Sequence, residues 1–126
     1  HVGSPASIIP WPGATAYTAS RWALRGLHEA LRQDLRGTGV SSSLVYLGEV
    51  SSEYFQANPD SHEHIPSVGS FIPVSTPERC AEVILDVVRR PRPVVFFPFA
   101  LRLLAWNAAL APGPTRWLIA RTGRKH

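Results

Sequence analysis

Two side chains that can do chemistry stand one helical turn apart near the start of this 126-residue chain. Tyr17 carries a phenol that can donate or accept a hydrogen bond, and Arg21 carries a permanent positive charge. Residues four apart lie on one face of a helix, and Tyr17 also shares its direction with Leu24 and Leu31. By spacing alone, a tyrosine that covers the end of the core beside a solvent-facing arginine is the simpler interpretation.

The residues around this pair point to a more specific interpretation. Residues 10–24 begin with Pro-Trp-Pro-Gly and place Thr-Ala-Ser directly after Tyr17. This run resembles the active-site segment of the short-chain dehydrogenase/reductase family, whose signature is a tyrosine followed four residues later by a lysine. Ser4 stands thirteen residues before Tyr17, where that family keeps its catalytic serine. The resemblance covers essentially the whole chain, but only the C-terminal half of a family member.

The resemblance implies a role for each of three catalytic residues. Tyr17 would be the general acid in carbonyl reduction and the base in alcohol oxidation, and Ser4 would hold the same oxygen. Arg21 stands where the family has a lysine that favours the ionised phenol and binds the ribose of the nicotinamide cofactor. Arginine keeps the charge and can donate to ribose, but it does not readily release a proton into a relay. The implied cofactor is NAD or NADP, bound in part by Tyr17 and Arg21.

A second stretch resembles the family's cofactor-binding turn. Residues 47–52 look like the Pro-Gly-x-Val-x-Thr stretch that binds the nicotinamide carboxamide, with Leu47 in place of the proline. The resemblance assigns cofactor contacts to Gly48, Val50 and Ser52, the last a hydroxyl in place of threonine. An ordinary turn at the exit of a strand is the alternative interpretation.

The irregular segment that follows would be the substrate lid by the same resemblance. Tyr54, Phe55 and Ile65 are its apolar candidates to line a pocket for a small-molecule substrate. His62, Glu63 and His64 contain potential metal ligands, but no further ligand accompanies them at a useful spacing. We therefore predict a solvated loop there and no metal site.

Three other features have structural interpretations. Cys80 shows no sign of a nucleophile and is expected to pack or to lie at the surface. His28 lies near the inward direction of its helix and is predicted to be a buried, hydrogen-bonded histidine. The Gly-Thr-Gly sequence at 37–39 ends a helix rather than opening one, so we do not expect it to bind a dinucleotide.

Alternating helices and strands must position these residues. Leu24, Leu27, Leu31 and Leu35 recur at helical spacing. The alternation predicts an α/β fold, the C-terminal half of a Rossmann-type doubly wound parallel sheet. The predicted elements are a loop over 4–13, a helix from Thr15 to the glycines, a strand over 40–47, a helix from Thr76 to just before Pro91, a strand over 93–97, and two helical pieces over 99–122 broken at 112–114.

Composition narrows the class of protein. Apolar residues make up 44% of the chain and charged residues 17%, which excludes disorder as the main state. The net charge of +4 is concentrated at the ends of elements, so we expect no nucleic-acid partner. A single cysteine excludes an intramolecular disulfide, and we expect a cytoplasmic protein.

The chain contains no methionine and begins at His1, so we expect a piece of a longer protein. Residues 1–126 would form the C-terminal part of one Rossmann-type domain whose dinucleotide-binding N-terminal half is absent. Isolated, such a piece should fold marginally and expose a sheet edge.

Three functions stay open. The first is an NAD(P)-dependent oxidoreductase that acts on a carbonyl or alcohol of a small apolar molecule. The second is a binding or scaffold protein of the same fold that has lost turnover through Arg21. The third is a membrane-surface module led by 99–118, although packing of that segment against the sheet or a subunit is favoured; its candidates for burial are Leu101, Leu104, Trp106 and Leu110. The family resemblance also implies a homo-oligomer through the Tyr17 helix, from whose polar side Trp22 projects.

Overall fold

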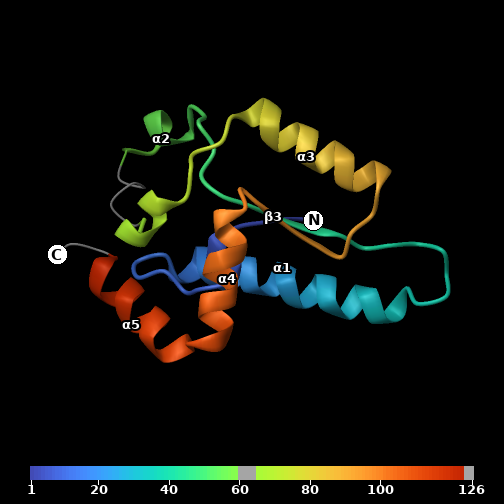
Figure 1. The fold of residues 1–126 in the computed structure, drawn as a ribbon, viewed down its shortest axis with the longest axis horizontal. Helices are drawn as coiled ribbons and strands as arrows, with labels where there is room; N and C mark the ends of the chain where they lie inside the picture. Colours follow the sequence, from blue (N-terminus) through green and yellow to red (C-terminus); the bar gives the residue numbers. More distant parts are fainter. Residues whose placement is uncertain (60–64, 124–126) are drawn as a thin grey trace.

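A three-stranded parallel sheet forms the centre of the computed structural model, which describes residues 1–59 and 65–123. Its strands are β1 (Val2–Gly3), β2 (Leu44–Leu47) and β3 (Val94–Phe97), and its longer helices are α1 (Thr15–Asp34), α3 (Pro77–Arg89), α4 (Ala100–Leu110) and α5 (Pro112–Thr122). The strands lie in the sheet in the order β1, β2, β3. Along the chain, α1 connects β1 to β2 and α3 connects β2 to β3 (Figure 1). The predicted α/β fold with a parallel sheet is confirmed.

The main hydrophobic cluster lies on one face of this sheet. The register places Tyr46 beside Phe96, and their stacked rings have centroids 4.9 Å apart. Leu44 points to the same face, because side chains two residues apart in a strand share a side. Leu24 of α1 and Leu101 of α4 pack against this cluster. Helices α1 and α4 therefore cover one face, and α3 lies on the other (Figure 1).

The buried side of α1 follows the predicted helical row, with one exception. His28 is fully buried, while Leu24, Leu31 and Leu35 are half-buried. Leu27 was predicted in the same row but is 51% exposed. At 3.6 residues per turn Leu27 points about 60° to one side of Leu24, whereas His28 points about 40° to the other side, next to Leu35. The inward side of α1 therefore buries His28, and Leu27, which the leucine pattern had placed there, faces outward.

Strand β2 is shorter than the strand predicted over 40–47. Gly37 and Gly39 have φ values of 78° and 79°, a region that favours glycine, and they carry the chain out of α1. The hydroxyl of Ser42 then pairs with Nδ1 of His28 at 2.8 Å. Pairing with β3 begins only at Leu44, two residues after this contact with α1.

Helix α3 begins as its sequence predicts. The Thr76 hydroxyl accepts a hydrogen bond from the Arg79 N–H at 3.3 Å, and Pro77 is the first helical residue. Glu78 follows in the first turn, where a backbone N–H and the Thr76 hydroxyl hold its pKa below the ordinary value. These contacts fix the end of the loop that leaves the pocket region.

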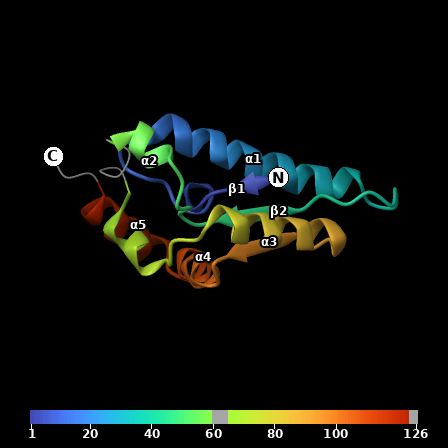
Figure 2. The ribbon, with the colours of Figure 1, turned by 90° about the horizontal axis from the view of Figure 1, so that it is seen from above.

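The C-terminal segment forms two helices, as predicted, but the break falls at Ala111 rather than within 112–114. Pro112 is the first residue of α5, a position where its fixed φ and missing N–H are well tolerated. The helices α2 (Tyr54–Ala57) and α5 both lie at the end of the molecule toward which the strands run (Figure 2). A short helix, η3 (Ser67–Phe71), contacts α5 there and was not predicted.

Candidate active site

A pocket of about 470 Å³ lies at the carboxyl ends of β1 and β2. Open parallel sheets bind ligands at this edge, because the loops that leave the strands gather there. All six candidate catalytic and cofactor-binding residues from the sequence analysis line this one pocket: Ser4, Tyr17, Arg21, Gly48, Val50 and Ser52. Three separate segments of the chain, the loop after β1, the first turns of α1 and the turn after β2, thus meet at one place.

Tyr17 and Arg21 are in contact, as their helical spacing predicts. The Cζ atom of Arg21 lies 4.9 Å from the centroid of the Tyr17 ring, within the range of a cation–π interaction. The ring of Trp11 lies near the same tyrosine, with centroids 6.5 Å apart. The Tyr17 side chain is 41% exposed and borders the pocket. The simpler interpretation, in which tyrosine covers the core and arginine extends into solvent, is therefore wrong.

The guanidinium of Arg21 is held at the boundary between the sheet and the pocket. Its Nη1 donates a long hydrogen bond of 3.5 Å to the carbonyl of Val2 in β1. Its Nε is buried and has no hydrogen-bond partner among the residues that the structure describes. A buried N–H without an acceptor is costly, so this arginine is held in place at an energetic cost.

Ser4 is buried at the point where β1 gives way to the helical turn η1 (Pro5–Ser7). Its hydroxyl oxygen accepts a hydrogen bond from the Ala6 N–H, and its own N–H donates to the hydroxyl of Ser7, both at 3.3 Å. These bonds hold the Ser4 side chain in place while using its oxygen only as an acceptor. The hydroxyl proton can therefore be donated to a group in the pocket.

The turn after β2 is fixed by backbone pairing on both sides. The Gly48 N–H donates to the carbonyl of Phe97 at 2.8 Å, and Val50 forms a parallel bridge with Ser75. A Cβ on Gly48 would lie 3.0 Å from Cδ of Pro98, so glycine is needed here for packing against the chain beyond β3. Ser52 is exposed, and its hydroxyl accepts from the Tyr54 N–H at 3.4 Å.

Part of the pocket wall was foreseen and part was not. Tyr54 and Ile65 line the pocket, as predicted for the lid, while nothing is described of the Phe55 side chain. The sequence analysis did not find the other wall residues, which include Ile9, Trp11, Glu49, Ile72, Leu104 and Ile119. Leu104 and Ile119 come from α4 and α5, and no spacing in the sequence relates them to Tyr17. Trp11 and Glu49 lie within the two motifs and could have been found from that proximity.

His28 and Cys80 do not line this pocket. His28 is buried, as predicted, and burial lowers its pKa from the ordinary value of 6.5. Cys80 is buried as well, and burial raises the pKa of its thiol from the ordinary value of 9.0. A thiol that is protonated and buried is a poor nucleophile, so Cys80 belongs to the packing of α3.

Two further searches cover only residues 1–59 and 65–123. Within them, no three His, Cys, Asp or Glu side chains gather in a way that could hold a metal ion. His62, Glu63 and His64 lie outside the described residues. No helix in this part of the chain has both the length and the apolar character needed to cross a bilayer.

Comparison with known proteins agrees with this geometry. An uncharacterized oxidoreductase of Listeria innocua is 24% identical over 94 residues, which cover 72% of this chain and 38% of the relative. An 11-beta-hydroxysteroid dehydrogenase-like protein of Arabidopsis thaliana is 27% identical over 88% of this chain and 36% of its own length. A 3-dehydrosphinganine reductase of Danio rerio is 28% identical over 88% of this chain and 34% of its own length. The chain thus spans about a third of the length of the curated relatives it matches.

The family profile described as short chain dehydrogenase matches residues 1–63, which is half of the chain. The matched region contains β1, α1, β2 and the turn after β2, and so includes every candidate site residue. The fold agrees, since three parallel strands with intervening helices carry these residues to one edge of the sheet. The chain therefore belongs to the short-chain dehydrogenase family.

Proposed function

We propose that this chain forms part of an oxidoreductase that transfers a hydride between NAD or NADP and a carbonyl or alcohol of a small, apolar substrate. Tyr17 is the general acid or base, and Ser4 and Arg21 act beside it. The observation that carries the proposal is the meeting of all six candidate residues around one pocket at the carboxyl edge of a parallel sheet.

The pocket suits the nicotinamide end of such a cofactor. The guanidinium of Arg21, a residue that lines the pocket, can donate hydrogen bonds to a ribose hydroxyl. The backbone of Gly48 and Val50 and the hydroxyl of Ser52 line the same pocket and can hold a carboxamide. When bound, the nicotinamide ring supplies or accepts the hydride.

The proton is moved by the chain's own residues. In the reductive direction the Tyr17 hydroxyl donates its proton to the substrate oxygen as the carbonyl becomes an alcohol. In the oxidative direction the phenolate takes that proton back. The Ser4 hydroxyl donates a hydrogen bond to the same oxygen and keeps it near Tyr17. The Arg21 guanidinium, whose Cζ lies 4.9 Å from the centroid of the tyrosine ring, holds that ring at the edge of the pocket.

The pocket walls support an apolar substrate. Ile9, Ile72, Leu104 and Ile119 contribute aliphatic surface, and Trp11 contributes an aromatic ring. Two relatives are named for a hydroxysteroid and for 3-dehydrosphinganine, molecules with large hydrocarbon parts. We therefore extend the substrate class to apolar ketones and secondary alcohols.

A second candidate function, a binding or scaffold protein without turnover, rests on Arg21. The guanidinium is engaged by the Tyr17 ring and by the Val2 carbonyl, and it does not readily lose a proton. If the reaction requires a proton relay through this position, Tyr17 would not regain its proton after each turnover. The protein would then bind cofactor and substrate without catalysis.

The test uses the protein that contains this chain, with NADH and NADPH and a set of apolar ketones. Tyr17→Phe should abolish turnover and leave cofactor binding, measured by nicotinamide fluorescence, within a few-fold of the original. Arg21→Lys should raise turnover, because lysine can pass on a proton. Arg25→Lys, one turn further along α1 and outside the pocket, is the matched control and should change neither.

The outcomes separate the two functions. Unchanged turnover in Tyr17→Phe contradicts the catalytic assignment. Cofactor binding without turnover in the original protein, with turnover appearing in Arg21→Lys, favours the binding protein.

A further inference from the structure

An apolar stripe runs along the outward side of α4. Phe99, Leu103, Trp106 and Leu110 are 62, 46, 51 and 87% exposed, respectively. Their spacing of four, three and four residues places them in one row on the helix. Single exposed apolar residues are common on protein surfaces. A contiguous row of large ones on one helix indicates a surface that binds another protein or a membrane.

The opposite side of α4 is already used by the fold. Leu101 is fully buried in the sheet cluster, and Leu104 is partly buried against it. The sequence analysis grouped Trp106 and Leu110 with these two leucines as candidates for burial, and the structure separates them, with both Trp106 and Leu110 exposed. Helix α4 is therefore apolar on both sides, a pattern typical of helices that are covered on both sides.

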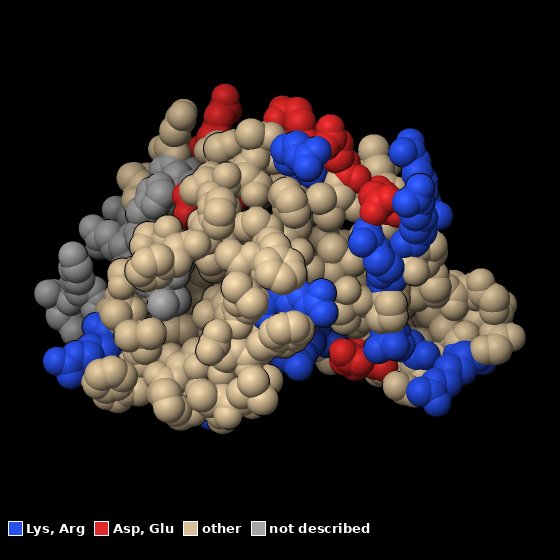
Figure 3. All heavy atoms as spheres, viewed as in Figure 1, with Lys and Arg blue, Asp and Glu red and all other residues tan. Residues whose placement is uncertain are grey.

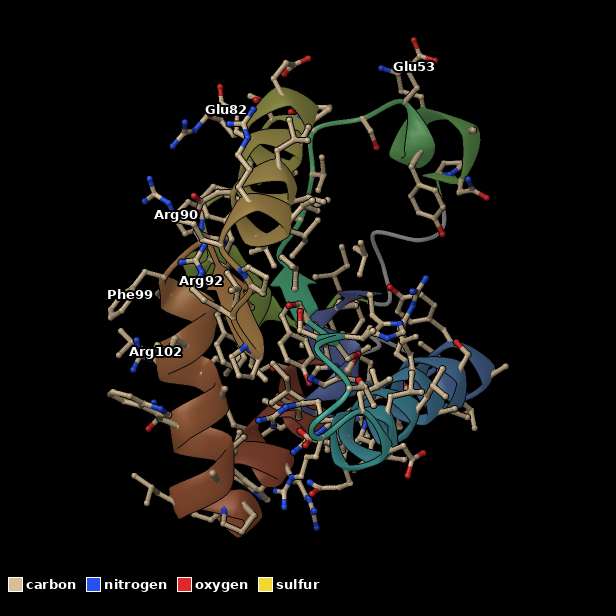
Figure 4. The ribbon with its side chains drawn as sticks, turned by 90° about the vertical axis from the view of Figure 1, so that its right-hand side faces the viewer. Glu53, Glu82, Arg90, Arg92, Phe99 and Arg102 are labelled. Atoms are coloured by element: carbon tan, nitrogen blue, oxygen red, sulfur yellow. The ribbon has the colours of Figure 1, made fainter. Side chains whose placement is uncertain are left out.

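The charge around the stripe has one sign. Residues 99–126 contain no Asp or Glu and five basic residues, so they carry +5, and the remaining residues sum to −1 in a chain of net charge +4. Figure 3 shows basic and no acidic side chains over α4 and α5 on this face. In Figure 4 Phe99 and Arg102 project from α4 away from the body of the molecule, on the same side as Arg90.

Aromatic rings and arginines are also paired here. The Cζ of Arg102 lies 4.8 Å from the Trp106 ring centroid, and that of Arg121 lies 5.3 Å from the Trp117 ring centroid. Tryptophan and arginine both combine an apolar body with a polar tip. Such side chains suit the headgroup region of a bilayer, where the apolar part enters the acyl boundary and the polar part stays in water.

We propose that this surface, made of the outward sides of α4 and α5, binds the surface of an anionic lipid bilayer. The stripe of Phe99, Leu103, Trp106 and Leu110 enters the acyl boundary, and the arginines bind lipid phosphates. The protein lies on the membrane and does not cross it. The pocket is walled in part by Leu104 of α4 and Ile119 of α5, so binding places the pocket close to the source of an apolar substrate.

A second copy of the chain fits this surface less well. A symmetric two-fold interface presents the same patch twice, so the basic residues of this surface would face a second, equally basic copy of it. The segment 99–126 offers no carboxylate to neutralise them. Lipid phosphates supply that missing negative charge.

The test is sedimentation of the protein that contains this chain with vesicles of phosphatidylcholine alone and of phosphatidylcholine with an equal amount of phosphatidylglycerol. The chain should sediment with the anionic vesicles, and added salt should weaken its binding, because salt screens exposed charges. The double variant Trp106→Gln/Leu110→Gln should lower the partition coefficient at least about tenfold, since burial of one large apolar side chain corresponds to roughly a factor of ten.

The matched control is the double variant Leu85→Gln/Val88→Gln, which removes two exposed apolar residues from α3. It should sediment with the vesicles as the original chain does, and both variants should keep the original circular dichroism spectrum. The proposal is overturned if the original chain stays in the supernatant with both kinds of vesicle, or if both double variants lose binding equally. It is also overturned if the α4 variant changes only the self-association of the chain, which would assign the stripe to a second copy.

Discussion

Helices α1 and α4 cover the same face of the sheet, yet they differ in how apolar residues are distributed between their buried and exposed sides. α1 buries Leu24 and His28 on one side and presents mostly polar or small residues on the other. α4 buries Leu101 and exposes large apolar residues on the opposite side. Outside the pocket, α1 exposes only the separate large apolar side chains of Trp22 and Leu27, whereas α4 exposes a continuous row of them that the described chain does not cover. The four predictions below test this difference.

The largest expected effect separates the two sides of α4. Leu101→Ala should lower the free energy of unfolding by about 2–5 kcal/mol, because it leaves a cavity beneath the sheet. Leu103→Ala, the same change two residues later on the exposed side, should cost less than about 0.5 kcal/mol. Urea denaturation monitored by circular dichroism measures both values. Equal losses would mean that the stripe is packed in the folded chain.

The corresponding pair on α1 should differ less. Leu24→Ala should cost about 1–3 kcal/mol, because Leu24 contacts the cluster but is only half-buried. Leu27→Ala should again cost less than about 0.5 kcal/mol, and the same denaturation experiment measures both. If Leu27 proves the more important of the two, the orientation of α1 on the sheet is wrong.

A third prediction concerns pH and the buried histidine of α1. Burial lowers the pKa of His28, with Arg32 and the His1 amino group acting in the same direction and Glu29 in the opposite one. The unfolded chain therefore takes up this proton first as the pH falls. With respect to His28, the free energy of unfolding should be highest above the unfolded pKa of 6.5. It should decline as the pH falls below that value, because protonation of this histidine favours the unfolded chain.

His28→Gln should remove this part of the pH dependence, whatever it does to stability at neutral pH. Denaturation from about pH 8 down to about pH 5.5 measures the slope, and the range above pH 7 is the internal reference because His28 is neutral there in both states. An equal slope in the variant would assign the pH dependence to other groups.

The smallest expected effect on stability is at Trp22 on the outward side of α1. We propose that this helix packs against its copy in a homo-oligomer, with Trp22 at the contact; its ring lies 5.8 Å from Cζ of Arg25 and is 41% exposed. Trp22→Ser should weaken self-association at least about tenfold in analytical ultracentrifugation and leave the denaturation midpoint unchanged. Trp106→Ser, the matched change on α4, should leave self-association as it is. The reverse result would exchange the roles of the two helices.

The elements with clear local signals could be predicted from the sequence. Local residues determine three elements that the structure contains: α1 through its leucine spacing, α3 through its Thr-Pro-Glu start, and β3 through the apolar run before Pro98. Around the pocket, Ser4, Tyr17 and Arg21 could be found because their spacing along the chain resembles a known pattern.

Features that depend on contacts between distant residues could not be predicted. The strand β2 starts only at Leu44, after Ser42 has bonded to His28 across fourteen residues, and nothing in the local sequence signals that contact. The two sides of α4 look alike in sequence, so only the position of β3 decides that Leu101 is buried and Leu110 is exposed. Leu104 and Ile119 reach the pocket only because α4 and α5 fold back toward it.

The bond between Arg21 and the Val2 carbonyl has a consequence for how the sheet grows. The His1 carbonyl accepts from Val45 in β2, so the next carbonyl along β1, that of Val2, points to the opposite, open edge. A further strand added at that edge would offer its own N–H to Val2 and compete with Arg21 for the same acceptor. The displaced guanidinium would then keep Tyr17 and the pocket as its neighbours. Extension of the sheet and release of the arginine toward the pocket would thus be one exchange of hydrogen bonds.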